Sequence, residues 1–131
     1  MRVLVVDDEK MLVHSLQRFL GLKGMEVVAA YSGDEALDKL ASAHIDIVIT
    51  DIIMSPMDGT RLVREVRARY KGVVIIVMTG ILNIAATIKE MENGADGYLI
   101  KPFSNLNYVW DVLQPWVKKA ERVAESNSGV S

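Results

Sequence analysis

The 131-residue sequence contains no cysteine, which excludes disulfide bonds and thiolate chemistry and is compatible with a reducing compartment. Its formal net charge is only −2, so no overall basic field would attract nucleic acid or an anionic membrane. No apolar run approaches the roughly 20 residues that span a bilayer, and the short VLVV segment near the N-terminus does not resemble a signal peptide. There is no internal repeat. We therefore expect one cytoplasmic domain that binds neither nucleic acid nor membrane directly.

What the sequence does contain is short apolar runs that alternate with segments of helical period. Strands are predicted at 2–7, 25–30, 46–51 and 72–79, and a weaker one at 96–101. Helices are predicted at 9–22, 32–41, 59–70, 83–93 and 104–123, the last interrupted or kinked at Pro115. Most of the strands are apolar on both faces, which is typical of a parallel sheet with helices on both sides. We expect a doubly wound α/β domain over residues 1–123, followed by a disordered tail or the start of a linker at 124–131.

Polar side chains stand where the predicted strands end. The first strand ends in Asp7-Asp8, the third in Asp51, the fourth in Thr79 and the fifth in Lys101. Ligands of such sheets bind at the carboxyl edge, where the ends of all parallel strands meet. We therefore expect these side chains to converge there, although two adjacent acids could also simply end a strand and favour the start of a helix.

Three neighbouring carboxylates repel one another unless a cation neutralises them or their pKa values rise. Mg²⁺ prefers oxygen ligands of this kind and binds through one or two carboxylates. A carboxylate beside Mg²⁺ can act as a nucleophile toward phosphorus and form an aspartyl phosphate. A hydroxyl group and a lysine would then hold the phosphoryl oxygens. Asp51, Thr79 and Lys101 fit these three roles.

Five segments together resemble the receiver domain of two-component response regulators, in particular the single-domain chemotaxis regulator. They are VVDDE, YSGDEAL, DIVITDIIMSPMDG, VIIVMTG and GADGYLIKPF. The resemblance covers about the first 120 residues, judged by element order and motif spacing. It implies a flavodoxin-like (βα)5 fold with a five-stranded parallel sheet in the order 2-1-3-4-5.

The resemblance implies that Asp51 accepts a phosphoryl group from a histidine kinase or a phosphotransfer protein. Asp8 and Asp51 would bind Mg²⁺ directly, and the backbone carbonyl of Ile53 would be a third ligand. Asp7 would act on the ion through a water molecule.

The resemblance also implies how the phosphoryl group is held and detected. Thr79 and Lys101 would bind it, and the Lys101–Pro102 peptide bond would be cis. Thr79 and Tyr98 would form a coupled switch, with Tyr98 turning inward as Thr79 moves. The face built from the fourth helix, fifth strand and fifth helix would then bind a downstream protein or a second copy.

Two bulky apolar residues, Ile53 and Ile81, stand two places after Asp51 and Thr79, where many receivers have a polar residue. We expect them to hinder the water that hydrolyses the aspartyl phosphate and to slow autodephosphorylation. Whether the chain should be counted as an enzyme stays open, because it would catalyse only its own phosphorylation and dephosphorylation.

Three other functions are compatible with parts of the pattern. A Mg²⁺-dependent phosphatase acting through an aspartyl phosphate would need a second acid two residues after the nucleophile, where Ile53 stands. A nucleotide- or flavin-binding module would need a glycine-rich loop after the first strand, which is absent. A degenerate receiver that only binds partners would not need the complete set of Asp, Thr and Lys.

Overall fold

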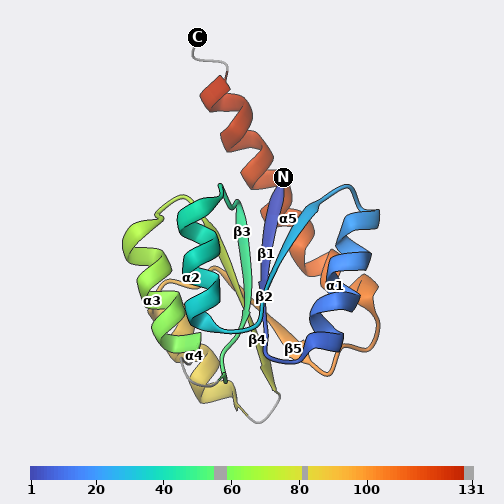
Figure 1. Cartoon of the computed structure of the whole chain (residues 1–131), viewed down its shortest axis with the longest axis vertical. Helices are drawn as coiled ribbons and strands as arrows, with labels where there is room; N and C mark the ends of the chain where they lie inside the picture. Colours follow the sequence, from blue (N-terminus) through green and yellow to red (C-terminus); the bar gives the residue numbers. More distant parts are fainter. Residues whose placement is uncertain (55–58, 81–82, 129–131) are drawn as a thin grey trace.

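The structure is a computed structural model that describes residues 1–54, 59–80 and 83–128. The described residues form alternating strands and helices, as the sequence predicts (Figure 1). The strands are β1 (Arg2–Val6), β2 (Glu26–Ala30), β3 (Ile47–Asp51), β4 (Val74–Gly80) and β5 (Gly97–Lys101). The helices are α1 (Lys10–Leu22), α2 (Gly33–Ser42), α3 (Gly59–Arg69), α4 (Ile84–Glu92) and α5 (Leu106–Ser128).

The strands form one sheet in the order β2-β1-β3-β4-β5, and every neighbouring pair is parallel. This confirms the predicted doubly wound, flavodoxin-like sheet. From β1 the chain first passes to β2 on one side and later to β3 on the other side. The strand order therefore reverses at β1, and the carboxyl ends of β1 and β3 flank the crevice where such sheets bind ligands.

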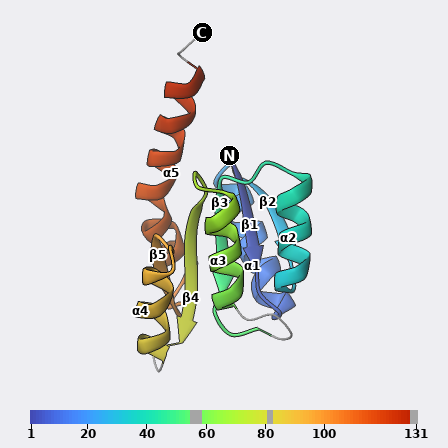
Figure 2. The same ribbon diagram turned by 90° about the vertical axis from the view of Figure 1, so that its left-hand side faces the viewer.

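Two apolar layers hold the helices against the sheet. Successive side chains of a strand point to opposite faces, so Val3 and Val5 join the cluster that packs under α1 and α5. Leu4 and Val6 join the cluster on the other face, which packs under α2 and α3. The turned view shows α2, α3 and α4 together in front of the sheet (Figure 2). Because helices cover both faces of the sheet, the part of it that a ligand can reach is the carboxyl edge, where the polar strand ends lie.

The last helix is longer than the sequence pattern predicts. It continues through Pro115 without interruption and ends at Ser128, projecting well beyond the sheet (Figures 1 and 2). The predicted boundary between the domain and a disordered tail at residue 124 therefore falls inside α5, and residues 129–131 lie outside the described part. Lys, Ala, Glu and Arg residues after Trp116 favour helix, which accounts for the extension. Within the described ranges, no helix is both long and apolar enough to cross a membrane.

Gly59 should tolerate a side chain poorly, because α3 begins directly against the end of β3 and the residue that follows it. A Cβ atom at this position would lie 2.2 Å from the backbone oxygen of Asp51. We expect Gly59→Ala to lower the free energy of unfolding by about 1–3 kcal/mol or more, measured by urea denaturation. Gly21→Ala in α1 is the control, because its Cβ would meet nothing within 4 Å; it should be neutral or slightly stabilising. Equal effects of the two variants would contradict this packing.

Candidate phosphoryl-acceptor site

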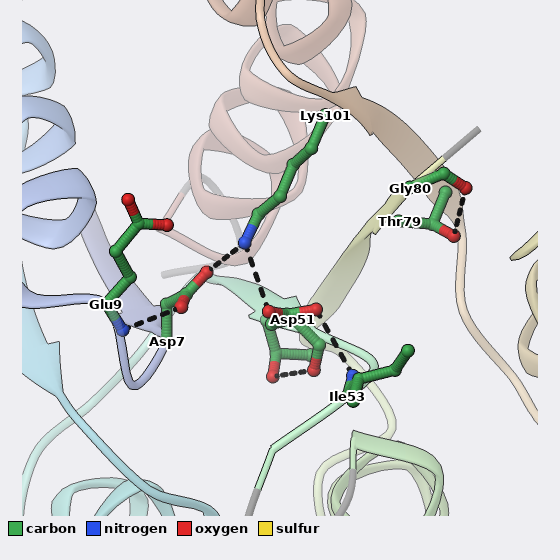
Figure 3. Close-up of polar contacts among 8 residues, drawn as sticks. Asp7, Glu9, Asp51, Ile53, Thr79, Gly80 and Lys101 are labelled. Carbon is green, nitrogen blue, oxygen red and sulfur yellow. Dashed lines mark hydrogen bonds and ion pairs between the residues drawn. The ribbon is translucent and has the colours of Figure 1, made fainter. Parts of the chain in front are cut away.

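Residues from three strand ends meet in one ion-paired group at the carboxyl edge of the sheet (Figure 3). The Lys101 ammonium nitrogen donates to Asp7 Oδ2 at 2.5 Å and to Asp51 Oδ2 at 3.0 Å. Asp7 follows β1, Asp51 ends β3 and Lys101 ends β5, so the contacts join residues 94 and 50 positions apart in sequence. The predicted convergence of Asp7, Asp51 and Lys101 is therefore found in the structure.

The acidic side of the site is a cluster of three carboxylates. Asp7, Asp8 and Asp51 each offer an oxygen within 4.8 Å of the others. Asp7 is fully buried and Asp8 is exposed, so the cluster reaches from the protein interior to solvent. Backbone amides fix two of the groups: Glu9 N donates to Asp7 Oδ1 at 2.9 Å, and Ile53 N donates to Asp51 Oδ1 at 3.2 Å. Both carboxylates are thus oriented before any ligand arrives.

Burial raises the pKa of the Asp51 carboxyl group above its ordinary value, and the hydrogen bond and charge of Lys101 offset only part of this effect. The nearby charge of Asp7 raises the Asp51 pKa further. Burial alone would lower the pKa of Lys101, but its hydrogen bonds to both carboxylates outweigh that and raise it. Lys101 therefore stays charged, while one ammonium group is shared between two acids.

The donor set fits a hard divalent cation. Three carboxylates and one ammonium group leave about two negative charges uncompensated, and every free donor in the cluster is an oxygen. Mg²⁺ takes such oxygen ligands and retains water on its open positions. Asp8 would admit the ion from solvent because its side chain is exposed.

Thr79 lies at the same edge but points away from Asp51 (Figure 3). Its hydroxyl donates to the Gly80 carbonyl oxygen at 3.3 Å and accepts from Thr87 Oγ1 in α4 at 2.9 Å. Thr87 is the residue that sequence reasoning missed, because a threonine inside a helix carries no motif. Its only signal is its place on the helix face turned toward the end of β4.

The remaining predicted residues occupy different surroundings. The Lys101–Pro102 peptide bond is cis, which confirms that expectation. Tyr98 is 47% exposed on β5, and Ile53 is 62% exposed beside Asp51. Ile81, the second residue expected to slow hydrolysis, lies outside the described residues.

Asp51→Asn should stabilise the metal-free domain at neutral pH. Below the ordinary aspartate pKa of 3.8, Asp51 is protonated in both the folded and the unfolded state, so its charge then has no effect on stability. Because folding raises the Asp51 pKa, the penalty of ionising it in the folded state develops as the pH rises from 3.8 through the raised folded-state pKa, and it is fully present above that pKa. The stabilisation by Asp51→Asn should therefore grow from acidic to neutral pH in urea titrations with chelator. Asp38→Asn, at an exposed position of α2, is the control; a similar pH-dependent gain there would contradict this explanation.

The sequence matches a family model described as "Response regulator receiver domain" over residues 3–110. It is 38% identical over 104 residues to the response regulator MprA of Mycobacterium avium, covering 79% of this chain and 46% of that protein. It is 37% identical over 103 residues to MprA of Mycobacterium tuberculosis, covering 79% of this chain and 45% of that protein. The chain thus spans just under half the length of the curated relatives it matches.

Solved structures agree with the family match. A two-component response regulator from Clostridium difficile superposes with a TM-score of 0.84 at 30% identity, over 90% of this chain and 96% of that one. The chemotaxis protein CheY4 of Vibrio cholerae superposes with a TM-score of 0.81 at 34% identity, over 87% of this chain and 96% of that one. The chain, with its lysine-bridged aspartates at the carboxyl edge of a 2-1-3-4-5 sheet, therefore belongs to the response regulator receiver domains of two-component systems.

Proposed function

We propose that the domain accepts a phosphoryl group on Asp51, in a Mg²⁺-dependent phosphorelay, from a histidine kinase or a phosphotransfer protein. The observation that carries this proposal is the Lys101 contact to Asp51 within a cluster of three aspartates at the sheet edge. A carboxylate oxygen of Asp51 forms the new bond to phosphorus, while the bond between phosphorus and the donor imidazole nitrogen breaks. The electron pair of that bond remains with the imidazole.

The neighbouring side chains prepare Asp51 for this reaction. The Ile53 amide and Lys101 orient the Asp51 carboxylate, and Lys101 stabilises the negative charge of the transferred oxygens. In this proposal Asp8, Asp51 and the Ile53 carbonyl hold Mg²⁺, and Asp7 acts through water. When bound, the ion would neutralise the aspartate cluster and the phosphoryl oxygens together.

Thr79 and Tyr98 would convert phosphorylation into a change of surface. Thr79 would leave Gly80 and Thr87 and donate its hydroxyl to a phosphoryl oxygen. Tyr98 would then turn inward toward the space near Thr79. A groove of about 220 Å³ that both Thr79 and Tyr98 line gives the ring a route.

The output face in this proposal is formed by α4, β5 and α5, and its partner is a downstream protein or a second copy. Exposed apolar side chains on α4 and β5 support the assignment, namely Ile84, Ile88, Met91, Tyr98 and Ile100.

The domain would work in the cytoplasm and would not itself contact nucleic acid or membrane. A Mg²⁺-dependent phosphatase remains the enzymatic alternative, and a degenerate receiver that acts only as a protein-binding module remains the non-enzymatic one; the complete Asp51, Thr79 and Lys101 set favours the receiver function over both.

Incubation with acetyl phosphate and Mg²⁺ should add one phosphoryl group per chain, detected by intact mass spectrometry. Asp51→Asn should abolish the addition, and Asp38→Asn should leave it unchanged. Chelation of Mg²⁺ should slow the addition at least tenfold, because about 1.4 kcal/mol of lost transition-state stabilisation already has that effect. Labelling that survives in Asp51→Asn would contradict the assignment, and many turnovers of the donor per chain would favour the phosphatase.

Autodephosphorylation should be slow and should accelerate several-fold in Ile53→Asn. Ile53 is exposed beside Asp51, where a bulky apolar side chain hinders the attacking water and an amide could orient it. The measurement is phosphate release from the purified phosphorylated domain. Ile53→Leu, which keeps the bulk and the apolar character, should retain the slow rate. A lifetime of seconds that Ile53→Asn leaves unchanged would contradict this role.

A further inference from the structure

Helix α5 and the amino edge of the sheet, where the strands begin, line a cavity on the far side of the domain from Asp51. Figure 1 shows α5 projecting past this edge, near the N-terminus. The cavity has a volume of about 550 Å³, which suits a small molecule, since such sites commonly measure about 300–1,000 Å³. Asp46 in its lining precedes β3, and Asp51 ends β3. At roughly 3.3 Å per residue, about 16 Å of strand separates the two sites.

The lining of this cavity is largely apolar, and separate elements contribute to it. Ile45 precedes β3, Val73 precedes β4, and Ala120 and Val123 lie on α5. Ile45 and Val73 are buried, whereas Val123 is 53% exposed. The ring of Tyr70, directly after α3, also lines the cavity and packs against the apolar cluster under α2 and α3. Such a lining favours a ligand with a flat aromatic body, because aromatic rings stack on one another and bury apolar area.

One arginine fixes the wall of the cavity before any ligand arrives. Arg67 Nε donates to the Gly94 carbonyl oxygen at 3.0 Å. Its Nη1 donates to the carbonyl oxygens of Lys71 and Val73 at 3.0 and 2.9 Å. Its Nη2 donates to Asp96 Oδ2 at 2.8 Å. The turn between α3 and β4 and the start of β5 are thus held together by one guanidinium group, whose donors are already engaged.

The two acids in the lining also have partners within the chain. Asp96 is ion-paired with Arg67. Asp46 Oδ2 accepts a hydrogen bond from the backbone nitrogen of Arg2 at 2.8 Å, and its Oδ1 lies 3.0 Å from His44 Nε2. Each carboxylate therefore already contacts a donor of the protein, so the lining offers little to a cationic ligand.

The two lysines in the lining have no such partners. Neither Lys71 nor Lys119 forms an ion pair within residues 1–54, 59–80 and 83–123. Lys71 follows α3 and Lys119 lies on α5, so their ammonium groups reach the cavity from separate elements. A negatively charged group is the ligand chemistry that both of them lack.

We propose that this cavity is a binding site for an aromatic organic anion, a flat ring system that bears one carboxylate, sulfonate or phosphate group. The ring system packs against Tyr70, and the anionic group lies between Lys71 and Lys119. Because the ligand contacts both the sheet edge and α5, its binding holds the projecting part of α5 against the domain. That part is short, and isolated helices of fewer than about 12–15 residues are marginal in water. The site goes beyond phosphoryl acceptance and does not depend on it.

The probe for this site is 8-anilinonaphthalene-1-sulfonate, whose fluorescence reports binding. N-phenyl-1-naphthylamine, the same ring system without the sulfonate, should bind several-fold more weakly because it cannot pair with the lysines. Since the chain has no cysteine, Val123→Cys places a single thiol in the lining. At ten times its Kd the sulfonate leaves about one site in eleven free, so maleimide labelling there should slow about tenfold. Glu121→Cys, exposed on α5 outside the lining, should label at the same rate with and without the probe.

The two lysines should each contribute to the affinity for the sulfonate. Lys71→Gln and Lys119→Gln should each raise its Kd about two- to fivefold, the range for one exposed ion pair. Lys118→Gln is the matched control, because Lys118 is exposed beside Lys119 and does not line the cavity. It removes the same charge and should leave the Kd unchanged at physiological ionic strength, where distant charges are screened.

Filling the cavity should exclude the probe. Ala120→Phe should weaken binding at least tenfold, whereas Glu121→Phe adds the same ring on α5 outside the lining and should not weaken it. Urea denaturation checks that both variants fold, and the lysine variants decide the question if Ala120→Phe does not.

Equal affinity for the two probes, an unchanged Kd in both lysine variants, or equal labelling at position 123 with and without the sulfonate would overturn the proposal. Asp51→Asn should leave the probe affinity unchanged, because the two sites lie at opposite edges of the sheet. Failure of the anion site therefore leaves phosphoryl acceptance untouched, and failure of phosphoryl acceptance leaves the anion site untouched.

Discussion

The ion-paired contact of Lys101 with Asp7 and Asp51 is the interaction on which the rest of the site depends. It joins β5 to the ends of β1 and β3 across the sheet edge, although these strands are far apart in sequence. Because Asp7 is fully buried, its charge is tolerable only while Lys101 compensates it; breaking a buried pair by removing one partner typically costs about 3–5 kcal/mol. The single positive charge of Lys101 is shared between Asp7 and Asp51, so it compensates Asp51 only in part. The burial of Asp51, which raises its pKa, is therefore only partly offset by Lys101; the cation and the phosphoryl group of the proposed function would relieve this cost.

A second connection leads from this edge to the surface. Thr79 lies near the end of β4, at the same edge as the site. Its hydroxyl is hydrogen-bonded to Thr87 rather than to Asp51. Any ligand that attracts Thr79 must therefore break a contact with α4. The helix on the other side of that contact buries a carboxylate without a partner and exposes isoleucines. Such a packing is unfavourable, because a buried polar group without a partner raises the free energy of the folded state.

Stability is thus lowered at the two places where function would operate. Burial raises the Asp51 pKa at the acceptor, and unpaired polar atoms lie beneath α4. Two apolar clusters offset these local free-energy costs. They contain fully buried valines, leucines and isoleucines from β1, β3 and β4. Active and switching elements are commonly drawn from the less stable parts of a fold.

The sequence alone determined the order of strands and helices, because apolar strands buried on both faces have a local pattern that only a covered parallel sheet satisfies. It also placed Asp7, Asp51 and Lys101 at one edge, since parallel strands end on the same side. The predicted end of α5 was wrong because composition indicates a polar tail but does not say whether its backbone continues as a helix. The direction in which α4 faces, the burial of Glu90 and the Thr87–Thr79 bond were decided only by tertiary structure. A helix takes the orientation that suits its neighbours, and here packing against the sheet overrides the apolar stripe that the sequence would have turned inward.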